Sequence, residues 1–456
     1  MMGFRGYIAR PFSQNFVVGI LLFCLPGIYT ALTGLGAGGG HPSSADVANK
    51  TNAILYGLFA LVGFFGGTLV NVLRPRTCLM IGSLGYPLYV GGLWYYDRTG
   101  HSWFPLLGGA VLGLTGGFLW STAAFVQFAY AHEKDKALYI SIQWMLRSFG
   151  AMVGSSISLS LNIHQTRPVG VSNAVYIVFI ILHASAFFIA MVFIVHPKDV
   201  VRKDGTHIAI SRDTKVWYEI KETIKLMTTR KYLFMAPAQL GCEMGLALVS
   251  SVNGRFFNLR TRSVNNFTYQ TIQILMPGLL ICVLDSRFIK SRRHRGLVGM
   301  GIMGTIAIAG CVGLMSWLKV NHVESRLVSD PYDWTDPQFG GMLACFLLFG
   351  ATYAGYQMCT EYTLSSTTVD PAQLARVAGM FKFYSTFGMM ISFLLAGERV
   401  PFIGQASLQL AFFVLGIIGV VWVLIFHVAD TDYPTQEGLP TPEDVDKDLK
   451  EEERNV

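Results

Sequence analysis

Long apolar segments separated by short polar ones constrain the fold of this chain more than any other feature. Each segment has about the 17–25 residues that a helix needs to cross the hydrocarbon core of a membrane. Six of them precede one polar loop and six follow it. Because a backbone in lipid must satisfy its own hydrogen bonds, each segment predicts a transmembrane helix. The predicted spans are Asn15–Gly34, Ala53–Leu73, Thr77–Tyr96, Pro105–Gln127, Leu138–Leu161, Asn173–Val195, Tyr232–Val252, Thr268–Leu284, Gly296–Leu318, Gly341–Ser365, Val377–Ala396 and Leu408–Val428.

The pattern predicts an all-α membrane protein with twelve transmembrane helices in two pseudo-symmetric six-helix bundles. We expect an N-terminal bundle at 1–195, a cytosolic central loop at 196–231, a C-terminal bundle at 232–428 and an acidic, disordered cytosolic tail at 429–456. Only 14% of the residues are charged and 52% are hydrophobic, which leaves no room for a soluble domain. Repeated halves are typical of transporters whose site lies between them near the middle of the membrane.

The distribution of basic residues predicts the orientation of the chain. Lys and Arg concentrate in the segments that lie on the same side as the N-terminus, which by the positive-inside rule places both termini in the cytosol. The net charge of +7 therefore reflects topology and does not indicate a nucleic-acid partner. Two acceptor triplets, at Asn49 and Asn266, fall in predicted outer loops and predict glycosylation. The home membrane is left open between the plasma membrane and an endomembrane or vacuolar compartment.

Two ionisable residues lie deep inside predicted spans. Arg147 is in the fifth span and Glu243 is at similar depth in the seventh; Gln143 and Gln239 share their respective helix faces. An ionised group at this depth costs about 3 kcal/mol on insertion scales, so each requires a reason. We expect Arg147 and Glu243 to face a central cavity, where they pair or bind a polar or anionic solute. The alternative is a fixed structural pair that contacts no substrate.

Two further charges are expected nearer the cytosol. Glu361 and Lys382 fall near the cytosolic ends of the tenth and eleventh spans. They have a role in substrate binding or gating, or else Lys382 extends its amine to the interface or simply pairs with Glu361. If protons drive this protein, Glu243 is the best candidate for the coupling group, because burial favours the protonated carboxyl.

The loop after the second span, GGTLVNVLRPR, resembles a degraded form of the loop motif shared by the major facilitator superfamily. The resemblance implies a conformational latch made by Gly67, Asn71, Arg74 and Arg76. Asn71 stands where the motif has an acid, and Arg74 stands where it has a second glycine. The corresponding place after the eighth span keeps its acid, Asp285.

Three longer stretches resemble one branch of that superfamily, the fungal members of the Unc-ninety-three-like (uncoordinated) family. They are Gly19–Gly39, Asn52–Asn71 and Phe257–Asn266. Arg260 and Arg262 in the third stretch violate the charge rule, and we expect them to hold the outer loop by bonding to helix C-termini. Weaker matches are Trp120, Trp144 with Gly150 and Gly154, and Phe381 and Lys382 with Gly388.

The resemblance implies the major facilitator fold and leaves two functions open. One is a secondary transporter that moves an unknown small solute by alternating access, with lining residues from spans one, four, seven and ten. The other is a non-transporting escort or ion-channel regulator with a vestigial cavity and a protein partner. Polar cavity positions depart from the family pattern at Ala123, Arg147, Ser148 and Tyr353, so no substrate carries over.

Sequence motifs for catalysis are missing from the chain. It contains no phosphate-binding glycine loop, no metal-spaced His/Cys cluster and no nucleophile–base pattern. We therefore expect no enzyme activity, no cofactor and no metal. The expected partners are a small solute and the lipid bilayer, with proton coupling left open.

Overall fold

The structure is a computed structural model that describes residues 4–34, 44–131, 135–162, 173–201, 216–286, 288–323, 331–368 and 370–428. Within these ranges every regular element is a helix, apart from one isolated bridge between Phe257 and Tyr332. The predicted acidic tail at 429–456 lies outside the described residues. The fold is that of the all-α membrane protein predicted from the hydropathy pattern.

The first predicted span is one continuous helical segment with a wider turn in the middle. After the short α1 (Phe4–Ile8) it consists of α2 (Pro11–Leu22), the π-helix η1 (Phe23–Gly27) and α3 (Ile28–Gly34). Pro26 lies in the π turn, where its missing N–H cannot complete the helical hydrogen-bond ladder. The rest of the first half contains α4 (Ser44–Phe64), α5 (Gly66–Thr99), α6 (Trp103–Ala129), α7 (Lys136–Asn162) and α8 (Asn173–Phe193).

The second half begins with helical structure in the predicted central loop. A 3₁₀ turn, η4 (Pro197–Asp199), and an α-helix, α9 (Val216–Met227), lie there on either side of residues outside the description. The remaining helices correspond to the predicted spans seven to twelve. They are α10 (Arg230–Phe256), α11 (Leu259–Leu284), α12 (Arg292–Val320), α13 (Gln338–Ser365), α14 (Pro371–Gly397) and α15 (Phe402–His427).

The second and third predicted spans meet at a sharp kink inside α5. Arg74 has φ 67° and ψ 154°, so the helix axis breaks there and Pro75 begins the next segment. A positive φ favours glycine, the residue that the superfamily motif has at this place. Arg74 therefore holds a backbone conformation that glycine adopts most readily.

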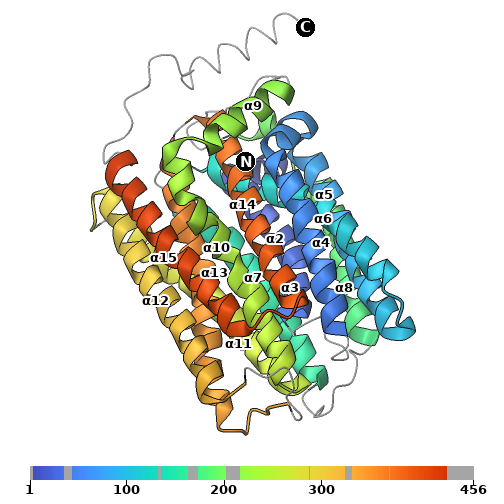
Figure 1. Cartoon of the computed structure of the whole chain (residues 1–456). Helices are drawn as coiled ribbons and strands as arrows, with labels where there is room; N and C mark the ends of the chain where they lie inside the picture. The colour runs from blue at the N-terminus through green and yellow to red at the C-terminus, as the bar shows by residue number, and fades with distance from the viewer. Residues whose placement is uncertain are drawn as a thin grey trace, which may run out of the picture.

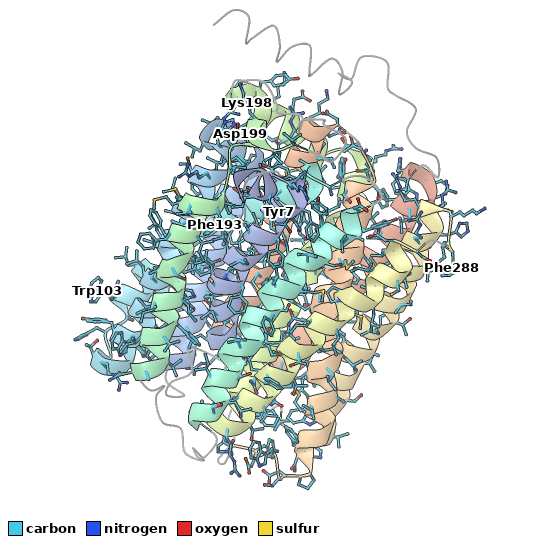
Figure 2. The ribbon with its side chains drawn as sticks, turned by 180° about the vertical axis from the view of Figure 1, so that it is seen from behind. Tyr7, Trp103, Phe193, Lys198, Asp199 and Phe288 are labelled. Atoms are coloured by element: carbon cyan, nitrogen blue, oxygen red, sulfur yellow. The ribbon has the colours of Figure 1, made fainter. Side chains whose placement is uncertain are left out.

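Helices from the two halves alternate across the middle of the molecule. Figure 1 shows α4, α5, α6 and α8 on one side and α12, α13 and α15 on the other, with α2, α7, α10 and α14 between them. Two pairs join the halves most closely: α4 packs along α14, and α7 packs along α11. In Figure 2, Lys198 and Asp199 lie at the end that carries α9, while Trp103 and Phe288 project from opposite flanks.

Ten of the described helical segments are long and apolar enough to cross a membrane. The two other predicted spans, in α5 and α7, do not reach that apolarity. α7 carries Arg147, Gln143 and several serines, and it packs against α2, η1, α3 and α11. A polar helix of this kind can cross lipid when its polar face is covered by other helices.

The structure places both predicted glycosylation acceptors inside helices, whereas the sequence predicted them in loops. Asn266 is 1% exposed inside α11, which begins nine residues earlier than the predicted span, and its amide binds α3 and α7. Asn49 lies in α4 and is 9% exposed. An acceptor must be accessible in a loop, so neither side chain can carry a glycan in this conformation.

The two unusual arginines sit in the first turns of α11 and not in a loop. Arg262 donates from Nε to the carbonyl of Phe257, the C-cap residue of α10, at 2.6 Å. This is the helix C-terminal contact expected from the sequence. Arg260 instead forms an ion pair with Asp333, which precedes α13.

Glycines at the crossing of α10 and α14 provide a test of the packing. A Cβ on Gly388 would overlap the carbonyl oxygen of Leu240, whereas a Cβ on Gly301 would meet nothing within 4 Å. We expect Gly388→Ala to destabilise the protein by about 1–3 kcal/mol, because the backbones cannot separate without loss of contacts. Gly301→Ala, on the exposed face of α12, should be neutral or slightly stabilising. Equal melting temperatures for the two variants would contradict this packing.

Candidate functional site

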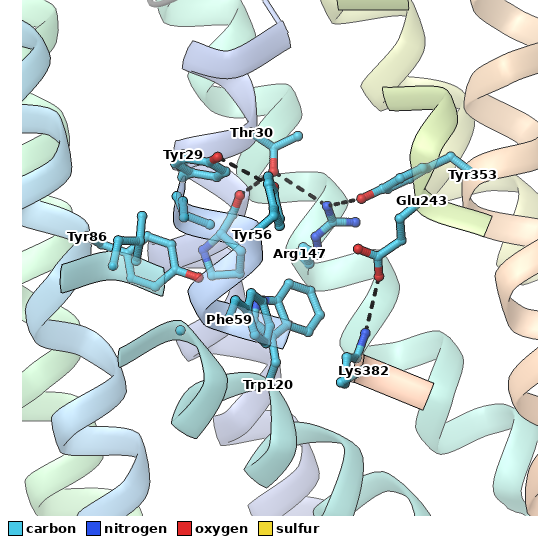
Figure 3. Close-up of a pocket in the computed structure, with 14 residues that line it drawn as sticks. Tyr29, Thr30, Tyr56, Phe59, Tyr86, Trp120, Arg147, Glu243, Tyr353 and Lys382 are labelled. Atoms are coloured by element: carbon cyan, nitrogen blue, oxygen red, sulfur yellow. Dashed lines mark hydrogen bonds and ion pairs between the residues drawn. The ribbon is translucent and has the colours of Figure 1, made fainter. Parts of the chain in front are cut away.

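Arg147 lies near the middle of α7 and is 4% exposed. Its Nη2 donates to the hydroxyl of Tyr353 at 3.3 Å and to Oγ1 of Thr30 at 3.5 Å (Figure 3). Three aromatic rings surround the guanidinium, with centroid distances of 4.7 Å to Trp144, 5.2 Å to Tyr353 and 5.4 Å to Trp120. Such cation–π contacts stabilise a desolvated cation by about 2 kcal/mol. Arg147 therefore joins the first half, through Thr30, to the second half, through Tyr353.

The π turn of the first span determines where Arg147 lies. A Cβ on Gly27 would overlap the backbone oxygen of Arg147, and a Cβ on Gly150 would overlap that of Phe23. The two glycines thus let η1 and α7 approach to backbone contact, as small residues do between membrane helices. Thr30 donates to the carbonyl of Pro26 at 2.5 Å. Its oxygen therefore presents a lone pair to the arginine.

Glu243 in α10 forms an ion pair with Lys382 in α14, with 3.3 Å between Oε1 and Nζ. The Lys382 ammonium also lies 4.5 Å from the ring centroid of Trp120. Lys382 is 2% exposed, so it does not extend to the interface as one of the sequence alternatives proposed. The structure corrects the pairing as well: Glu243 and Arg147 face the same space, but the ion-pair partner of Glu243 is Lys382.

The remaining predicted polar residues lie around these charges. Gln143 donates to Asn15 at 2.8 Å and to the carbonyl of Ala123 at 3.2 Å. Glu361 is 2% exposed and accepts a hydrogen bond from Gln357 at 2.9 Å, so it does not pair with Lys382. The side-chain amide of Gln239 is buried, and neither of its polar atoms has a partner among the described residues.

Two small cavities meet at these residues. The first has a free volume of about 30 Å³, room for one or two water molecules. The second has about 10 Å³ and shares Trp120, Arg147 and Lys382 with the first. The first cavity is lined mainly by aromatic and charged side chains: Tyr29, Tyr56, Phe59, Tyr86, Trp120, Tyr353, Arg147, Glu243 and Lys382.

The lining is broader than the sequence predicted. Spans one, four, seven and ten contribute, as expected, through residues such as Thr30, Trp120, Glu243 and Tyr353. The second, third, fifth and eleventh spans line the cavity as well. The tyrosines of the second and third spans, Tyr56 and Tyr86, were missed by the sequence analysis, although Tyr86 lies in the middle of its apolar segment, away from the interfaces where tyrosine is usually enriched.

Asp285 ends α11 at the other side of the molecule from Asn266. Its Oδ2 accepts a hydrogen bond from the backbone N–H of Leu138, in the first turn of α7, at 3.2 Å. The acid of the predicted latch therefore joins the second half to the first. Of the other latch residues, Arg74 lies at the kink and Arg76 is exposed. Gly67 and Asn71 belong to α5, and their surroundings lie outside the description.

Comparisons with known proteins agree with this architecture. The model of the Major Facilitator Superfamily matches residues 12–393. An uncharacterized membrane protein of Schizosaccharomyces pombe is 38% identical and aligns over 93% of this chain and 86% of its own length. A UNC93-like protein of the same organism is 31% identical over 86% of this chain and 77% of its own. The chain belongs to the UNC93-like branch of the major facilitator superfamily.

The fold itself is shared with solved transporters. The superfamily transporter FucP, in its outward conformation, aligns over 90% of this chain and 98% of its own with a TM-score of 0.60. Sequence identity is 13%, so the likeness concerns the fold alone. The chain is thus a multi-pass membrane protein with the fold of the major facilitator superfamily.

Asp285 should give the protein a measurable pH dependence. Burial raises the pKa of its carboxyl from 3.8 to about 6, although the Leu138 N–H and the Arg295 guanidinium lower it in part. A raised pKa means that the folded state binds more protons than the unfolded state between these values, so stability is lost as pH rises from about 4 to about 6. Asp285→Asn, which keeps an acceptor for Leu138, should remove this loss.

The measurement is the melting temperature of both proteins in the same detergent across that interval. The two should agree at the acidic end, and the variant should be the more stable one near neutral pH. A difference between them that stays constant with pH would contradict the assignment.

Proposed function

We propose that this protein is a secondary transporter that moves a small solute by alternating access between an N-terminal bundle (1–195) and a C-terminal bundle (232–428). The observation that carries the proposal is a group of buried charged and aromatic side chains enclosed between helices of the two halves. Groups of this cost are retained in a membrane protein mainly where a solute or ion must pass. The hydrogen-bonding contacts that close the cavity at its two ends support the same function.

One closure lies on the side of Asn266. The amide of Asn266 donates to the carbonyl of Ala31 at 2.8 Å and to Oγ of Ser155 at 3.0 Å. Asn253 donates to the carbonyl of Gly34 at 3.0 Å. Both carbonyls belong to the last turn of α3, whose C=O groups have no partner within the helix. Two asparagines from α10 and α11 thus cap a helix of the opposite half.

The opposite closure contains the contact between Asp285 and Leu138 described above. A neutral hydrogen bond contributes about 0.5–1.5 kcal/mol net and one to a charged group about 1.5–3 kcal/mol, so the bonds at either end can break at modest cost. An alternating mechanism requires this, because each closure must break in turn while the other persists. We place the Asn266 end on the outer side of the membrane and both termini in the cytosol. The membrane is the plasma membrane or that of an endomembrane or vacuolar compartment.

The ion pair between Glu243 and Lys382 is the proposed coupling device. Protonation of Glu243 would release the Lys382 ammonium, which already contacts Trp120 at the boundary between the two cavities. Because α10 and α14 pack against each other and α14 also packs against α4, a change in this pair acts on both halves. In this proposal the proton binds to Glu243, the residue that the sequence analysis favoured.

One observation favours the alternative function of an escort or channel regulator. The cavities hold no more than a few water molecules, as a vestigial site would. A transporter in an occluded state has the same appearance, so the two functions differ in whether the closures open.

Solute profiling separates the two functions. We compare cells that lack the protein with cells that overproduce it or its Glu243→Gln variant. A transporter should change the cellular level of at least one solute, and the variant should abolish that change at unchanged surface expression. Unchanged solute levels combined with a displaced partner protein would establish the escort function.

Weakening the Asn266 closure should increase access to the cavity. Gly116 lines the first cavity, and a side chain there would make ordinary contacts with Phe59. In the Gly116→Cys background, Asn266→Ala removes both hydrogen bonds to the first half, and one from Gln270 within α11, and should raise labelling by an impermeant maleimide about fivefold or more. The reagent is applied from the side opposite the termini, and labelling of the parent chain is subtracted.

Asn321→Ala serves as the matched control, because Asn321 bonds only within its own helix end, to the carbonyl of Trp317. Its labelling should equal that of Gly116→Cys alone. Equal labelling of the Asn266 and Asn321 variants would reject the proposed closure.

A further inference from the structure

The four buried ionisable groups around the cavities differ in how they are compensated. Lys382 and Glu243 neutralise each other in an ion pair. Glu361 accepts a hydrogen bond from Gln357. Among the described residues, no carboxylate lies within ion-pair distance of Arg147, and its Nε has no hydrogen-bond partner. Arg147 is therefore the one of the two cations that has no direct ion-pair partner, and the carboxylate of Glu243 acts on it only across the cavity.

The contacts of Arg147 leave most of its binding capacity unused. A guanidinium has five N–H donors in a planar fork, and the Thr30 and Tyr353 bonds use one nitrogen at 3.5 and 3.3 Å. A carboxylate fits this fork with two parallel hydrogen bonds. A buried cation without a direct ion-pair partner is costly, so an anion that reaches Arg147 gains both an ion pair and its hydrogen bonds.

The rest of the lining limits what else the anion can carry. Glu243 faces the same cavity, as Figure 3 shows, and would repel a second negative charge. Tyr29, Tyr56, Phe59 and Tyr86 offer ring surfaces on the side of the cavity away from the ion pair. These surfaces favour an apolar body. A cation is disfavoured by Arg147 and Lys382 together.

We propose that Arg147 binds the carboxylate of a small organic monoanion whose apolar body packs against the aromatic rings of the first cavity. This inference rests on the proposed transport function and specifies its substrate class. Arg147 holds Thr30 of one half and Tyr353 of the other through the same nitrogen. A carboxylate that occupies the fork competes with these bonds, so its binding loosens the contact between the halves and widens the cavity.

The test uses matched pairs of probes that differ only in charge. The purified full-length protein is heated with acetate, hexanoate or benzoate, and with acetamide, hexanamide or benzamide at the same concentrations. A ligand that binds the folded state raises the melting temperature by mass action. We expect concentration-dependent shifts with hexanoate and benzoate, a smaller shift with acetate, and none with the three amides.

Three variants connect the shift to Arg147. Arg147→Gln should abolish it, and Arg147→Lys should retain it at roughly tenfold higher carboxylate concentration, because an ammonium keeps the charge but loses the bidentate geometry. Arg255→Gln, at the exposed outer end of α10, should behave as the unmodified protein. The lysine variant keeps the test decisive if the glutamine variant fails to fold.

Equal shifts with an amide and its carboxylate, shifts that survive in Arg147→Gln, or no shift with any of the six probes would each overturn the inference. None of these results bears on transport itself, which the Glu243→Gln solute profiles decide separately. Solute changes in those profiles without any carboxylate shift would retain the transporter and reject the substrate class.

Discussion

The absence of water from the membrane interior governs the centre of this structure. A charge placed there must be compensated by the protein, because the solvent cannot compensate it. The protein compensates its buried charges by three different means: an ion pair for Glu243 and Lys382, a side-chain amide for Glu361, and aromatic rings for Arg147. Of these, the third leaves most of the donors of a planar guanidinium unused, because the bonds of Arg147 to Thr30 and Tyr353 come from one nitrogen.

Close helix packing makes this compensation possible. Gly27 and Gly150 bring the π turn of the first span into backbone contact with α7, and this places Thr30 beside Arg147. Gly388 does the same for α14 and α10, so that Lys382 reaches Glu243. Without such approaches the charged groups would be separated by the width of intervening side chains. The small residues therefore determine the distances between the buried charged groups and their partners.

The sequence predicted the helices, the family and the burial of Arg147 and Glu243, because each of these depends on local hydropathy or on short motifs. It misplaced groups near the ends of spans for one physical reason. Lys382 lies near the start of the predicted span, which begins at Val377. The helix α14 begins at Pro371, so the lysine lies about 17 Å into the helix. Polar residues in the first turns lower the local hydropathy although other helices cover them. The same error placed Asn266 in a loop ahead of the predicted span, which begins at Thr268. The helix α11 in fact begins at Leu259 and includes Asn266.

The pairing of Glu243 could not be predicted, because it depends on which helices are neighbours in space. Residues 243 and 382 are far apart in the chain, and hydropathy carries no information on the contact between α10 and α14. The tyrosines of the cavity escaped detection for a related reason. An aromatic residue in an apolar segment has the same local signature whether it faces lipid, a neighbouring helix or a cavity.

Ends and centre of the molecule differ in the strength of their contacts between halves, and this difference has a mechanical consequence. At the ends, asparagine amides, the Asp285 carboxylate and an exposed ion pair between Arg399 and Asp46 form a few contacts that carry little net energy each. At the centre, Arg147 connects the halves through an ionised group whose environment is incomplete without an anion. The equilibrium between conformations then depends less on the closures than on what occupies the centre. A ligand can shift such an equilibrium only by its differential affinity for the two conformations. Because Arg147 contacts both halves, an anion bound to it can have such a difference in affinity.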